Sequence, residues 1–580
     1  MKVASIMFTS PNVRIALWAL FVLSLFWNWQ TWQTDYAPKP VATPPGSAAA
    51  TSLDSAAPIV AAPPAAAASA TPATSAAAPA PAAVPMIAAA GTPSADGAVA
   101  SAAKVHVVTD VLDLDISLRG GELSRADLPG YVESKGSRVP VRLLNRDSDS
   151  STYVLQSGLA SSDGAAAPTH LADFQSAVNE LRLAPGQEEI RLPLTWTNGA
   201  GVTVTKTYSF RRGSYQIGLD YLVQNAGTAP WSFSAYAQLM RYNQPVETSY
   251  FKPDTYSFKG PAYFDGSKYQ KLKIESAGTA LDSEVKGGWI AGLQHHFVAA
   301  VIPARDEAQH YKLAVRGHEY LLTASSAART VGPGAQAHEV ETLFVGPKLQ
   351  RQLDLAGPKL HLVTDYGWLA VIAQLLFALL DFIHRFVGNW GVTIMLATLV
   401  LKLIFYPLSE ASGKSMAKMK QLQPRLKNLQ ETYKDQRDKL GQAMMELYKK
   451  EKVNPAAGCL PMLVQIPVFI AFYWVLLESV EMRQAPFVGW INDLSSRDPW
   501  FILPLIMAGS SYMQYKLNPQ MGADPMQAKI MGLMPVFMSV MFAFFPAGLV
   551  LYWVTNTVLS IAQQWNINRR IEAAAAKARR

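Results

Sequence analysis

Five apolar stretches in the last third of the chain restrict its fold more than any other feature. They cover about residues 389–408, 459–480, 499–517, 529–545 and 547–565. A helix rises about 1.5 Å per residue, so about 20 apolar residues cross the roughly 30 Å hydrocarbon core of a bilayer. The stretches therefore predict five membrane spans. Residues 545–548, FPAG, predict a tight turn between the last two.

The composition agrees with a membrane protein that also has a large soluble part. Half of the 580 residues are hydrophobic and 16% are charged, against about 25% charged residues in soluble domains. Cys459 is the single cysteine, which excludes an intramolecular disulfide. Nothing in the chain indicates a metal site, a cofactor or a catalytic residue.

Residues 1–35 contain one more apolar segment, with a core at about residues 15–29 that is preceded by basic residues. The core ends in Trp27 and Trp29, and Trp32 follows. Tryptophan is typical of the membrane interface, whereas a signal peptide ends in a small-residue cleavage site. The pattern favours an uncleaved N-terminal anchor, although small-residue sites further along leave cleavage open.

Residues 36–103 are mainly Ala, Pro, Ser and Thr, and up to residue 100 their charged residues are Lys39, Asp54 and Asp96. A segment of this composition cannot bury a hydrophobic core. It predicts a disordered, partly extended tether.

Residues 104–345 change to an alternation of apolar and polar residues, which is typical of β-strands. The clearest examples are residues 202–210, 215–225 and 296–302. The length fits one large β-sandwich or two small ones. His295 and His296 are adjacent on an expected strand, so we expect their side chains to point to opposite faces and not to share a metal.

The distribution of charge sets the topology. Residues 409–458 hold eleven Lys or Arg against six Asp or Glu, and the tail 569–580 is also basic. Basic loops stay in the cytoplasm, so both termini are expected there and the number of spans must be even. We therefore expect residues 346–388 to be a connector and an amphipathic helix in the outer interface, and the β-domain to be periplasmic.

The basic segment 409–458 has a helical pattern. Apolar residues recur at spacings of three and four before and after residues 434–439, KDQRDK, which predicts a cytoplasmic helical hairpin with one apolar stripe. Pro424 is expected to kink or restart the first helix. The basic residues expected to receive a ribosome or a substrate are Lys414, Lys418, Lys420, Arg425 and Lys427.

Polar residues of the predicted spans share one depth, in the half nearer the cytoplasm. They are Lys402, Thr398, Gln465, Ser510, Gln514, Tyr552, Asn556 and Ser560. Polar groups in a membrane usually face a bundle interior or water. Taken singly, Lys402 could instead extend to the lipid phosphates and the amides could hold helices together. Taken together, the residues favour a wet cavity open to the cytoplasm.

Other functions find less support. Residues 411–415, ASGKS, lack the first glycine of a phosphate-binding loop, because residue 408 is Leu. A small-solute channel or transporter would need polar residues through the outer half, and the spans show no inverted repeat. A membrane-anchored periplasmic carbohydrate-active protein would need paired carboxylates and a histidine in the β-domain.

Four segments resemble the YidC family of membrane protein insertases, in its Gram-negative bacterial form. They are residues 388–424, 454–476, 481–504 and 545–556, the last reading FPAGLVLYWVTN. The resemblance implies a β-supersandwich like that of galactose mutarotases, without their activity, and a five-span core at 389–568 with a groove closed on the outside. It places Tyr552 and Trp553 where the groove meets substrates. Lys402 stands where the family usually has arginine, which keeps the charge but not the planar fork of donors.

These features predict a membrane protein insertase and chaperone of the bacterial inner membrane that is not an enzyme. The implied partners are nascent inner-membrane proteins, the Sec translocon, ribosomes or targeting factors, and the lipid bilayer. Sequence-specific nucleic-acid binding is not expected, since the basic charges also explain the topology.

Overall fold

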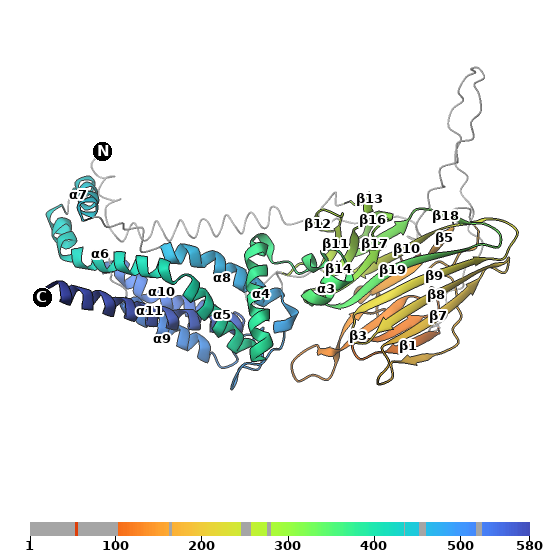
Figure 1. Ribbon diagram of the computed structural model, residues 1–580, viewed down its shortest axis with the longest axis horizontal. Coiled ribbons are helices and arrows are strands. Elements are labelled where there is room, and N and C mark those ends of the chain that lie inside the picture. Colours follow the sequence, from red (N-terminus) through yellow and green to blue (C-terminus); the bar gives the residue numbers. More distant parts are fainter. Residues whose placement is uncertain are drawn as a thin grey trace, which may run out of the picture.

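The computed structural model describes residues 53–55, 103–161, 165–244, 257–274, 280–433, 436–451, 460–517 and 525–579. The predicted anchor at residues 1–35 and nearly all of the predicted tether lie outside these residues. The described residues form a β-domain and a helical part that follow each other along the long axis of the molecule (Figure 1).

The β-domain consists of two sheets. One has eleven strands, in the order β13-β16-β17-β10-β5-β3-β2-β1-β6 with β18 and β4 at its side, and the other has eight, in the order β12-β11-β14-β15-β19-β9-β8-β7. The strands are β1 (Lys104–Val108), β2 (Asp113–Ser117), β3 (Leu123–Val132), β4 (Pro140–Leu144), β5 (Tyr153–Ser161), β6 (Glu180–Arg182), β7 (Glu189–Thr197), β8 (Val202–Arg211), β9 (Gln216–Asn225), β10 (Trp231–Tyr242), β11 (Gly260–Phe264), β12 (Tyr269–Lys271), β13 (Asp282–Lys286), β14 (Trp289–Leu293), β15 (Phe297–Pro303), β16 (Ala308–Arg316), β17 (Glu319–Ser326), β18 (Arg329–Val331) and β19 (Gln336–Pro347).

The two sheets enclose a single hydrophobic core, as the alternating pattern predicts. In β8 the buried positions are Val202, Val204, Lys206, Tyr208 and Phe210, and the residues between them are half-buried. Both sheets contribute to one continuous cluster of buried side chains. The prediction of a β-sandwich is therefore confirmed, in the form of one large sandwich.

The expectation for His295 and His296 is wrong. Both residues lie in the turn between β14 and β15, and not on a strand. Their rings stack with centroids 3.8 Å apart, because a turn does not impose the alternation of a strand. The part of the chain that the structure describes contains no group of three or more His, Cys, Asp or Glu residues placed to hold a metal ion.

The helical part follows the sandwich. Its α-helices are α3 (Gln350–Ala356), α4 (Ala370–Val387), α5 (Trp390–Ile404), α6 (Tyr406–Thr432), α7 (Arg437–Lys450), α8 (Leu460–Glu478), α9 (Ile502–Leu517), α10 (Pro525–Phe542) and α11 (Ala547–Arg579). α7 and the C-terminal end of α11 lie at the end of the molecule farthest from the β-domain (Figure 1).

The junction of α5 and α6 differs from the prediction. A span was expected to continue to residue 408, but the helix breaks at Phe405 and bends by 63° into α6. Pro407 lies in the first turn of α6, where proline is tolerated because the first amides of a helix have no intrahelical acceptor. Pro424 does not restart the helix, since α6 continues through it to Thr432.

α4 has three distinct faces. Ala373, Leu376 and Leu380 are buried against the other helices. The opposite face is apolar and exposed, with Val371 at 74% and Phe386 at 77% exposure. A third face carries Asp381, which pairs with Arg351 of α3 at 2.8 Å and with Arg385 at 2.7 Å.

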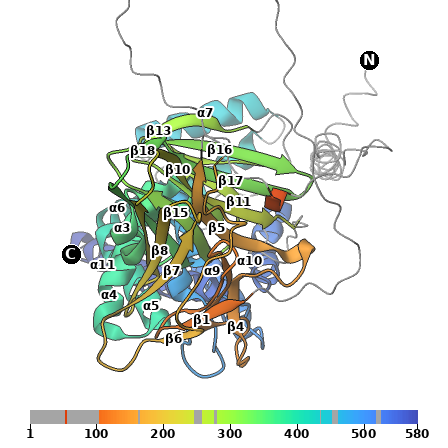
Figure 2. The same ribbon diagram turned by 90° about the vertical axis from the view of Figure 1, so that its right-hand side faces the viewer.

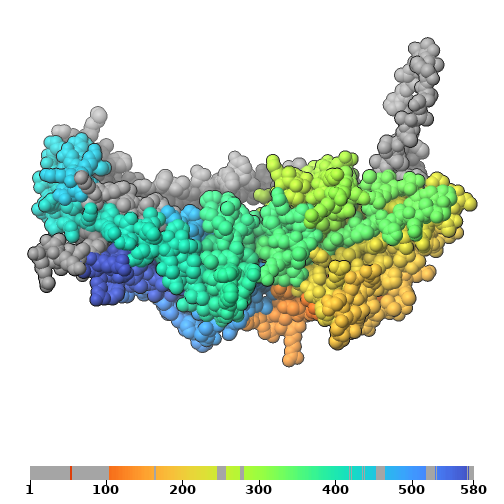
Figure 3. Space-filling model, viewed as in Figure 1, coloured from red at the N-terminus to blue at the C-terminus, as the bar shows by residue number. Residues whose placement is uncertain are grey.

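α4 runs across the other helices at the junction with the β-domain, where its side chains form the green-teal surface in the space-filling view (Figures 1 and 3). By length and composition, Gly367–Val387 is the one helix of the described residues that could cross a membrane by itself. The bent pair α5 and α6 passes the same test together, and Val464–Glu478 and Gly532–Phe542 are shorter apolar helices.

The β-domain and the helical part are joined by direct hydrogen bonds. Arg483, which follows α8, donates to the carbonyl oxygens of Val132 at 2.8 Å and Glu133 at 3.0 Å. The Ser257 hydroxyl donates to the Glu478 carboxylate at 3.2 Å. The C-terminal end of α8 is thus the end nearest the sandwich. The starts of α5 and α11 lie at the same end, because Asn389 and Ala547 donate to Phe487 and Ser496 of the segment that follows α8.

Candidate functional site

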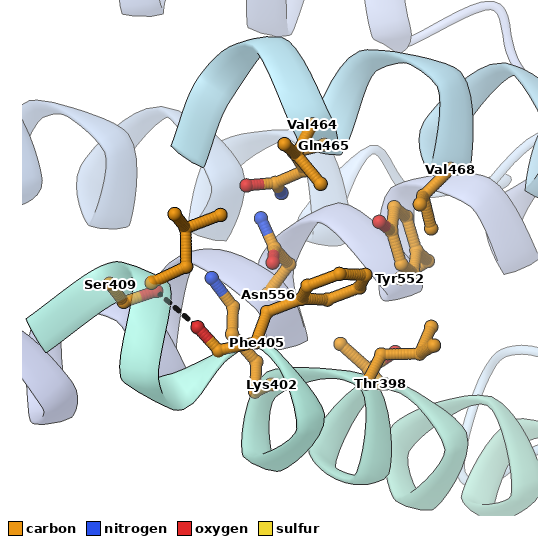
Figure 4. Close-up of a pocket in the computed structure, with 11 residues that line it drawn as sticks. Thr398, Lys402, Phe405, Ser409, Val464, Gln465, Val468, Tyr552 and Asn556 are labelled. Atoms are coloured by element: carbon orange, nitrogen blue, oxygen red, sulfur yellow. Dashed lines mark hydrogen bonds between the residues drawn. The ribbon is translucent and has the colours of Figure 1, made fainter. Parts of the chain in front are cut away.

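A cavity of about 540 Å³ opens between α6, α8, α9, α10 and α11, and a smaller one adjoins it between α5, α8 and α11. Four polar residues line both: Lys402, Ser409, Gln465 and Asn556. The close-up shows Gln465 of α8 opposite Asn556 of α11, with Lys402 of α5 between them and Ser409 (Figure 4). Side chains far apart in the sequence thus share one polar space.

Lys402 is held by α11. Its Nζ donates to Ser560 Oγ at 2.8 Å, and that hydroxyl donates to the carbonyl oxygen of Asn556 at 2.7 Å. An ammonium group has three donors, and among the described residues the other two have no hydrogen-bond acceptor. Because Lys402 lines both cavities, these donors are available to water or to a substrate.

Thr398 and Tyr552 lie deeper, toward the β-domain. Thr398 is one turn before Lys402 and lines the smaller cavity, with its hydroxyl donating to the Ile394 carbonyl oxygen at 2.7 Å. Tyr552 lines the smaller cavity together with Gln465. The polar lining therefore ends at about this depth.

Beyond Tyr552 the helices meet through aromatic side chains. Tyr552 stacks on Phe472 with centroids 4.4 Å apart, and Trp553 contacts Phe469 at 5.1 Å and Phe542 at 5.3 Å. The aromatic cluster comprises Phe469, Phe472, Tyr473, Phe542, Phe545, Tyr552 and Trp553. It occupies the β-domain side of the cavity, because it comes from the later turns of α8 and α10 and the first turns of α11.

The cavity brings together eight of the nine predicted groove residues. Gln514, Trp553 and Ser560 line the larger part, and Thr398 and Tyr552 line the smaller part. Ser510 does not line either cavity, and its hydroxyl donates to the Met507 carbonyl oxygen of its own helix at 3.1 Å.

Sequence reasoning missed Ser409 and Ser412, which line the larger cavity from α6. They were assigned to the loop at 409–458, whereas α6 already begins at Tyr406. Met416, Met538 and Met541 also line this cavity. Flexible, polarizable methionine side chains suit a surface that contacts many different sequences.

The predicted basic residues of the hairpin lie on α6, between Lys414 and Lys427. Lys418 and Lys427 are exposed, Lys414 pairs with Glu410 at 2.8 Å, and Arg425 pairs with Glu451 at 2.6 Å. Lys420 also lies on α6, and its side chain is not among those that the structure describes. α6 and α7 pack through apolar residues of the predicted stripe: Met419, Leu422, Leu426, Met444 and Leu447.

The β-domain has a polar cavity that the sequence did not reveal. It contains Asp115 and Glu122 together with His106 and His170. Burial would raise the pKa of Asp115, but hydrogen bonds from Arg125, Lys104 and His106 hold it well below its ordinary value. Glu122 is paired with Arg146. A carboxylate such as Asp115 that stays ionised between cations is poorly suited to act as a general acid.

The sequence is similar to those of known proteins along almost its whole length. Residues 104–379 match the YidC periplasmic domain family, and residues 382–575 match the family described as 60Kd inner membrane protein. Membrane protein insertase YidC of Thioalkalivibrio sulfidiphilus is 46% identical over 98% of this chain and 100% of its own length. The protein of the same name from Nitrosococcus oceani is 43% identical over 97% and 99%.

The chain also matches a crystal structure described as an active YidC insertase with the first transmembrane domain resolved. The match covers 80% of this chain and 92% of the chain in that structure, at 20% identity and a TM-score of 0.35. The assignment therefore depends on the sequence matches, which confirm the resemblance across almost the whole chain. The chain belongs to the YidC family of membrane protein insertases, with a periplasmic β-domain and a helical inner-membrane part.

Proposed function

We propose that the cavity around Lys402 receives the polar flank of an incoming chain while the adjacent hydrophobic segment enters the lipid. The observation that carries the proposal is the grouping of Lys402, Gln465, Asn556 and Ser560 in one cavity. The aromatic cluster supports closure on the periplasmic side, so that the cavity is open to the cytoplasm and the lipid.

The driving force comes from the substrate. The transfer of a Leu-like residue from water to the centre of a membrane helix is favourable by about 0.3–0.6 kcal/mol of free energy, so 20 such residues supply about 6–12 kcal/mol. Nucleotide hydrolysis is therefore not required in principle. The barrier is the dehydration of the polar flank, and a wet cavity that reaches half-way shortens the dehydrated path.

Lys402 attracts acidic flanks by its positive charge. It cannot form the planar bidentate contacts of arginine, but two of its donors face the cavity. The membrane potential then acts on the negative charge of the flank and draws it outward, with about 2.3 kcal/mol per elementary charge for each 100 mV.

The direction of the helices supports one arrangement in the membrane. We assign α5, α8, α9, α10 and the first half of α11 as five spans, which with the N-terminal anchor makes six and leaves both termini in the cytoplasm. α4 lies in the outer interface, since it runs across the other helices and has apolar, buried and polar faces (Figure 1). The exposed side chains of Leu505, Leu533 and Phe537 face lipid.

The hairpin of α6 and α7 receives substrates on the cytoplasmic side. Its exposed lysines suit a negatively charged ribosome surface, and it leads directly into the cavity through Ser409 and Ser412. The insertase acts alone on small substrates and beside the Sec translocon on larger ones.

A photo-crosslinking experiment tests the proposal. A photoreactive amino acid replaces Gln465 or Asn556 in the cavity, or Phe537 on the lipid face, and a ribosome-bound nascent inner-membrane protein is supplied. We expect the cavity positions to crosslink to the polar flank and Phe537 to crosslink to the hydrophobic segment or to lipid. Crosslinking of the flank to all three positions alike would rule out a dedicated cavity.

A further inference from the structure

The outer face of the eleven-stranded sheet is covered at one place by a segment of the tether. Alternation along β5, β10 and β17 directs Leu155, Leu239 and Leu322 into the core and their neighbours to the opposite face. Those neighbours, Val154, Met240 and Leu321, are nevertheless at most 6% exposed. Leu53 packs against them, so that the short segment Leu53–Ser55 lies beside β17 (Figure 2, in red).

The next residue, Asp54, is bound by three side chains of the β-domain. Arg146 donates to both of its carboxylate oxygens at 3.0 Å, and Gln156 Nε2 donates to Oδ1 at 2.7 Å. His170 Nε2 lies 2.8 Å from the backbone carbonyl oxygen of Asp54. Burial would raise the pKa of Asp54, but the hydrogen bond and charge of Arg146 lower it, so the carboxylate is ionised.

Buried neighbours fix the orientation of Gln156. Gln156 is 1% exposed and its Oε1 accepts from Gln238 Nε2 at 2.7 Å. Its Nε2 group is thereby directed outward, where it donates to Asp54 and to Glu122. An amide held in this way presents a donor to an acceptor group on the ligand.

The tautomer of His170 is fixed in the same manner. The Tyr236 hydroxyl accepts from the His170 backbone N–H at 3.0 Å and donates to His170 Nδ1 at 2.6 Å. The proton of the neutral ring is then on Nε2, which donates to the carbonyl oxygen of Asp54. Donors for a carboxylate and for a peptide carbonyl thus stand side by side, next to an apolar patch.

We propose that the surface formed by Arg146, Gln156, His170 and the adjoining apolar patch of the β-domain is a binding site for an acidic peptide segment with the sequence Leu-Asp. Leu53 and Asp54 of the tether occupy it in the same chain, at the edge of a cavity of about 970 Å³ that Asp54 itself lines. Arg146, Gln156 and His170 recognise the aspartate and its carbonyl group, and Val154, Met240 and Leu321 receive the leucine. The site is independent of the cavity around Lys402.

Docking shortens the tether. The docked leucine follows the predicted anchor by about 18 residues, which at about 3.3–3.6 Å per residue span at most about 60–65 Å. The site therefore limits how far the β-domain can move from the N-terminal anchor.

A peptide-binding experiment tests the site. The full-length chain in nanodiscs is prepared as wild type and as the double variant Leu53→Ala/Asp54→Ala, which vacates the site. A fluorescent peptide of residues 49–60, and a matched peptide with Asn in place of the aspartate, are titrated and followed by anisotropy. We expect the aspartate peptide to bind the double variant at least tenfold more tightly than wild type, where the tethered segment competes at high effective concentration. The Asn peptide should bind at least tenfold more weakly than the aspartate peptide.

Equal binding of the two peptides, equal binding to wild type and double variant, or absence of binding to the vacated site would each overturn the proposal. The variant Arg146→Gln should abolish the preference for aspartate. Arg146 also pairs with Glu122, so the Arg146→Gln variant loses this ion pair as well. The comparison of the aspartate and Asn peptides tests the site without the Arg146→Gln variant.

Discussion

The β-domain and the helical part each place a lysine among apolar residues and satisfy it in opposite ways. Lys206 is fully buried, and its ammonium donates to the carbonyl oxygens of Gly120, Gly121 and Ser157 at 2.8–3.2 Å. Lys402 donates to Ser560 and lines a cavity of about 540 Å³. One lysine has an acceptor for each donor, whereas the other keeps donors for water or substrate.

Lys206 thus stabilises the fold, whereas Lys402 can exchange water for a substrate as its hydrogen-bond partner. A buried charge with every donor paired rigidifies its surroundings, and removing it leaves its acceptors unpaired. A charge beside a polar cavity can change partners at little cost. The comparison predicts that substitutions in the two regions affect different properties.

Lys206→Met should show the largest effect on stability. It removes a donor from three buried carbonyl groups, of which that of Gly121 keeps the Tyr208 hydroxyl. Each group left unpaired costs about 1–3 kcal/mol, so we expect a loss of several kcal/mol. Hydrogen–deuterium exchange of peptides from β5 and β8 in the full chain measures it. Lys402→Met is the matched control, and an equal loss of protection in both variants would contradict the comparison.

Glu341→Gln should show a pH-dependent effect of up to a few kcal/mol. Burial, and then the charge of Glu339, raise the pKa of Glu341 from 4.5 to about 8. Between these values the folded chain keeps the proton that the unfolded chain releases, so wild type loses stability as the pH rises. Glutamine removes this loss.

Thermal unfolding of the β-domain at pH 5 and pH 9 measures the Glu341→Gln effect. The variant should exceed wild type at pH 9 and equal it at pH 5, while Glu284→Gln on an exposed edge should be neutral at both. A gain that is the same at the two pH values would show that the carboxyl group is not protonated in the fold.

Ser560→Ala should change stability by less than about 1 kcal/mol, because water in the cavity can replace the lost acceptor of Lys402. Unfolding of the helical part in mixed detergent micelles measures the change. Ser510→Ala, whose hydroxyl bonds its own helix, is the control. A loss of several kcal/mol on Ser560→Ala alone would mean that Lys402 is a structural residue like Lys206.

Arg425→Gln should show the smallest effect. Its ion pair with Glu451 is exposed, and such pairs contribute about 0–1 kcal/mol. Faster hydrogen exchange should be confined to α7 and should vanish at high salt, and Lys427→Gln should leave α7 unchanged. Faster exchange in α5 or α11 would contradict the separation of hairpin and cavity.

The regular parts of the fold could be predicted because their signals are local. The alternation in residues 202–210, 215–225 and 296–302 places β8, β9 and β15 to within one or two residues. The bend at Phe405 could not be predicted, because the apolar run continues past it to residue 408. A hydrophobic pattern indicates burial in lipid or protein, but it does not indicate where the chain changes direction.

The cavity could be predicted in part, because residues at one depth on neighbouring helices meet. Depth does not fix the direction of a side chain, which is why Ser510 bonds its own helix instead. The binding of Asp54 had no signal in the sequence, since an aspartate in an Ala- and Pro-rich segment is ordinary. Only the folded sheet brings Arg146, Gln156 and His170 together around it.

The most direct test of the account is insertion of a small membrane protein with an acidic flank into liposomes that contain this purified chain alone. Wild type is compared with Lys402→Ala and Lys402→Arg. The account predicts that wild type and Lys402→Arg insert the substrate and that Lys402→Ala fails. Equal insertion by Lys402→Ala would contradict a function for the charge in the cavity.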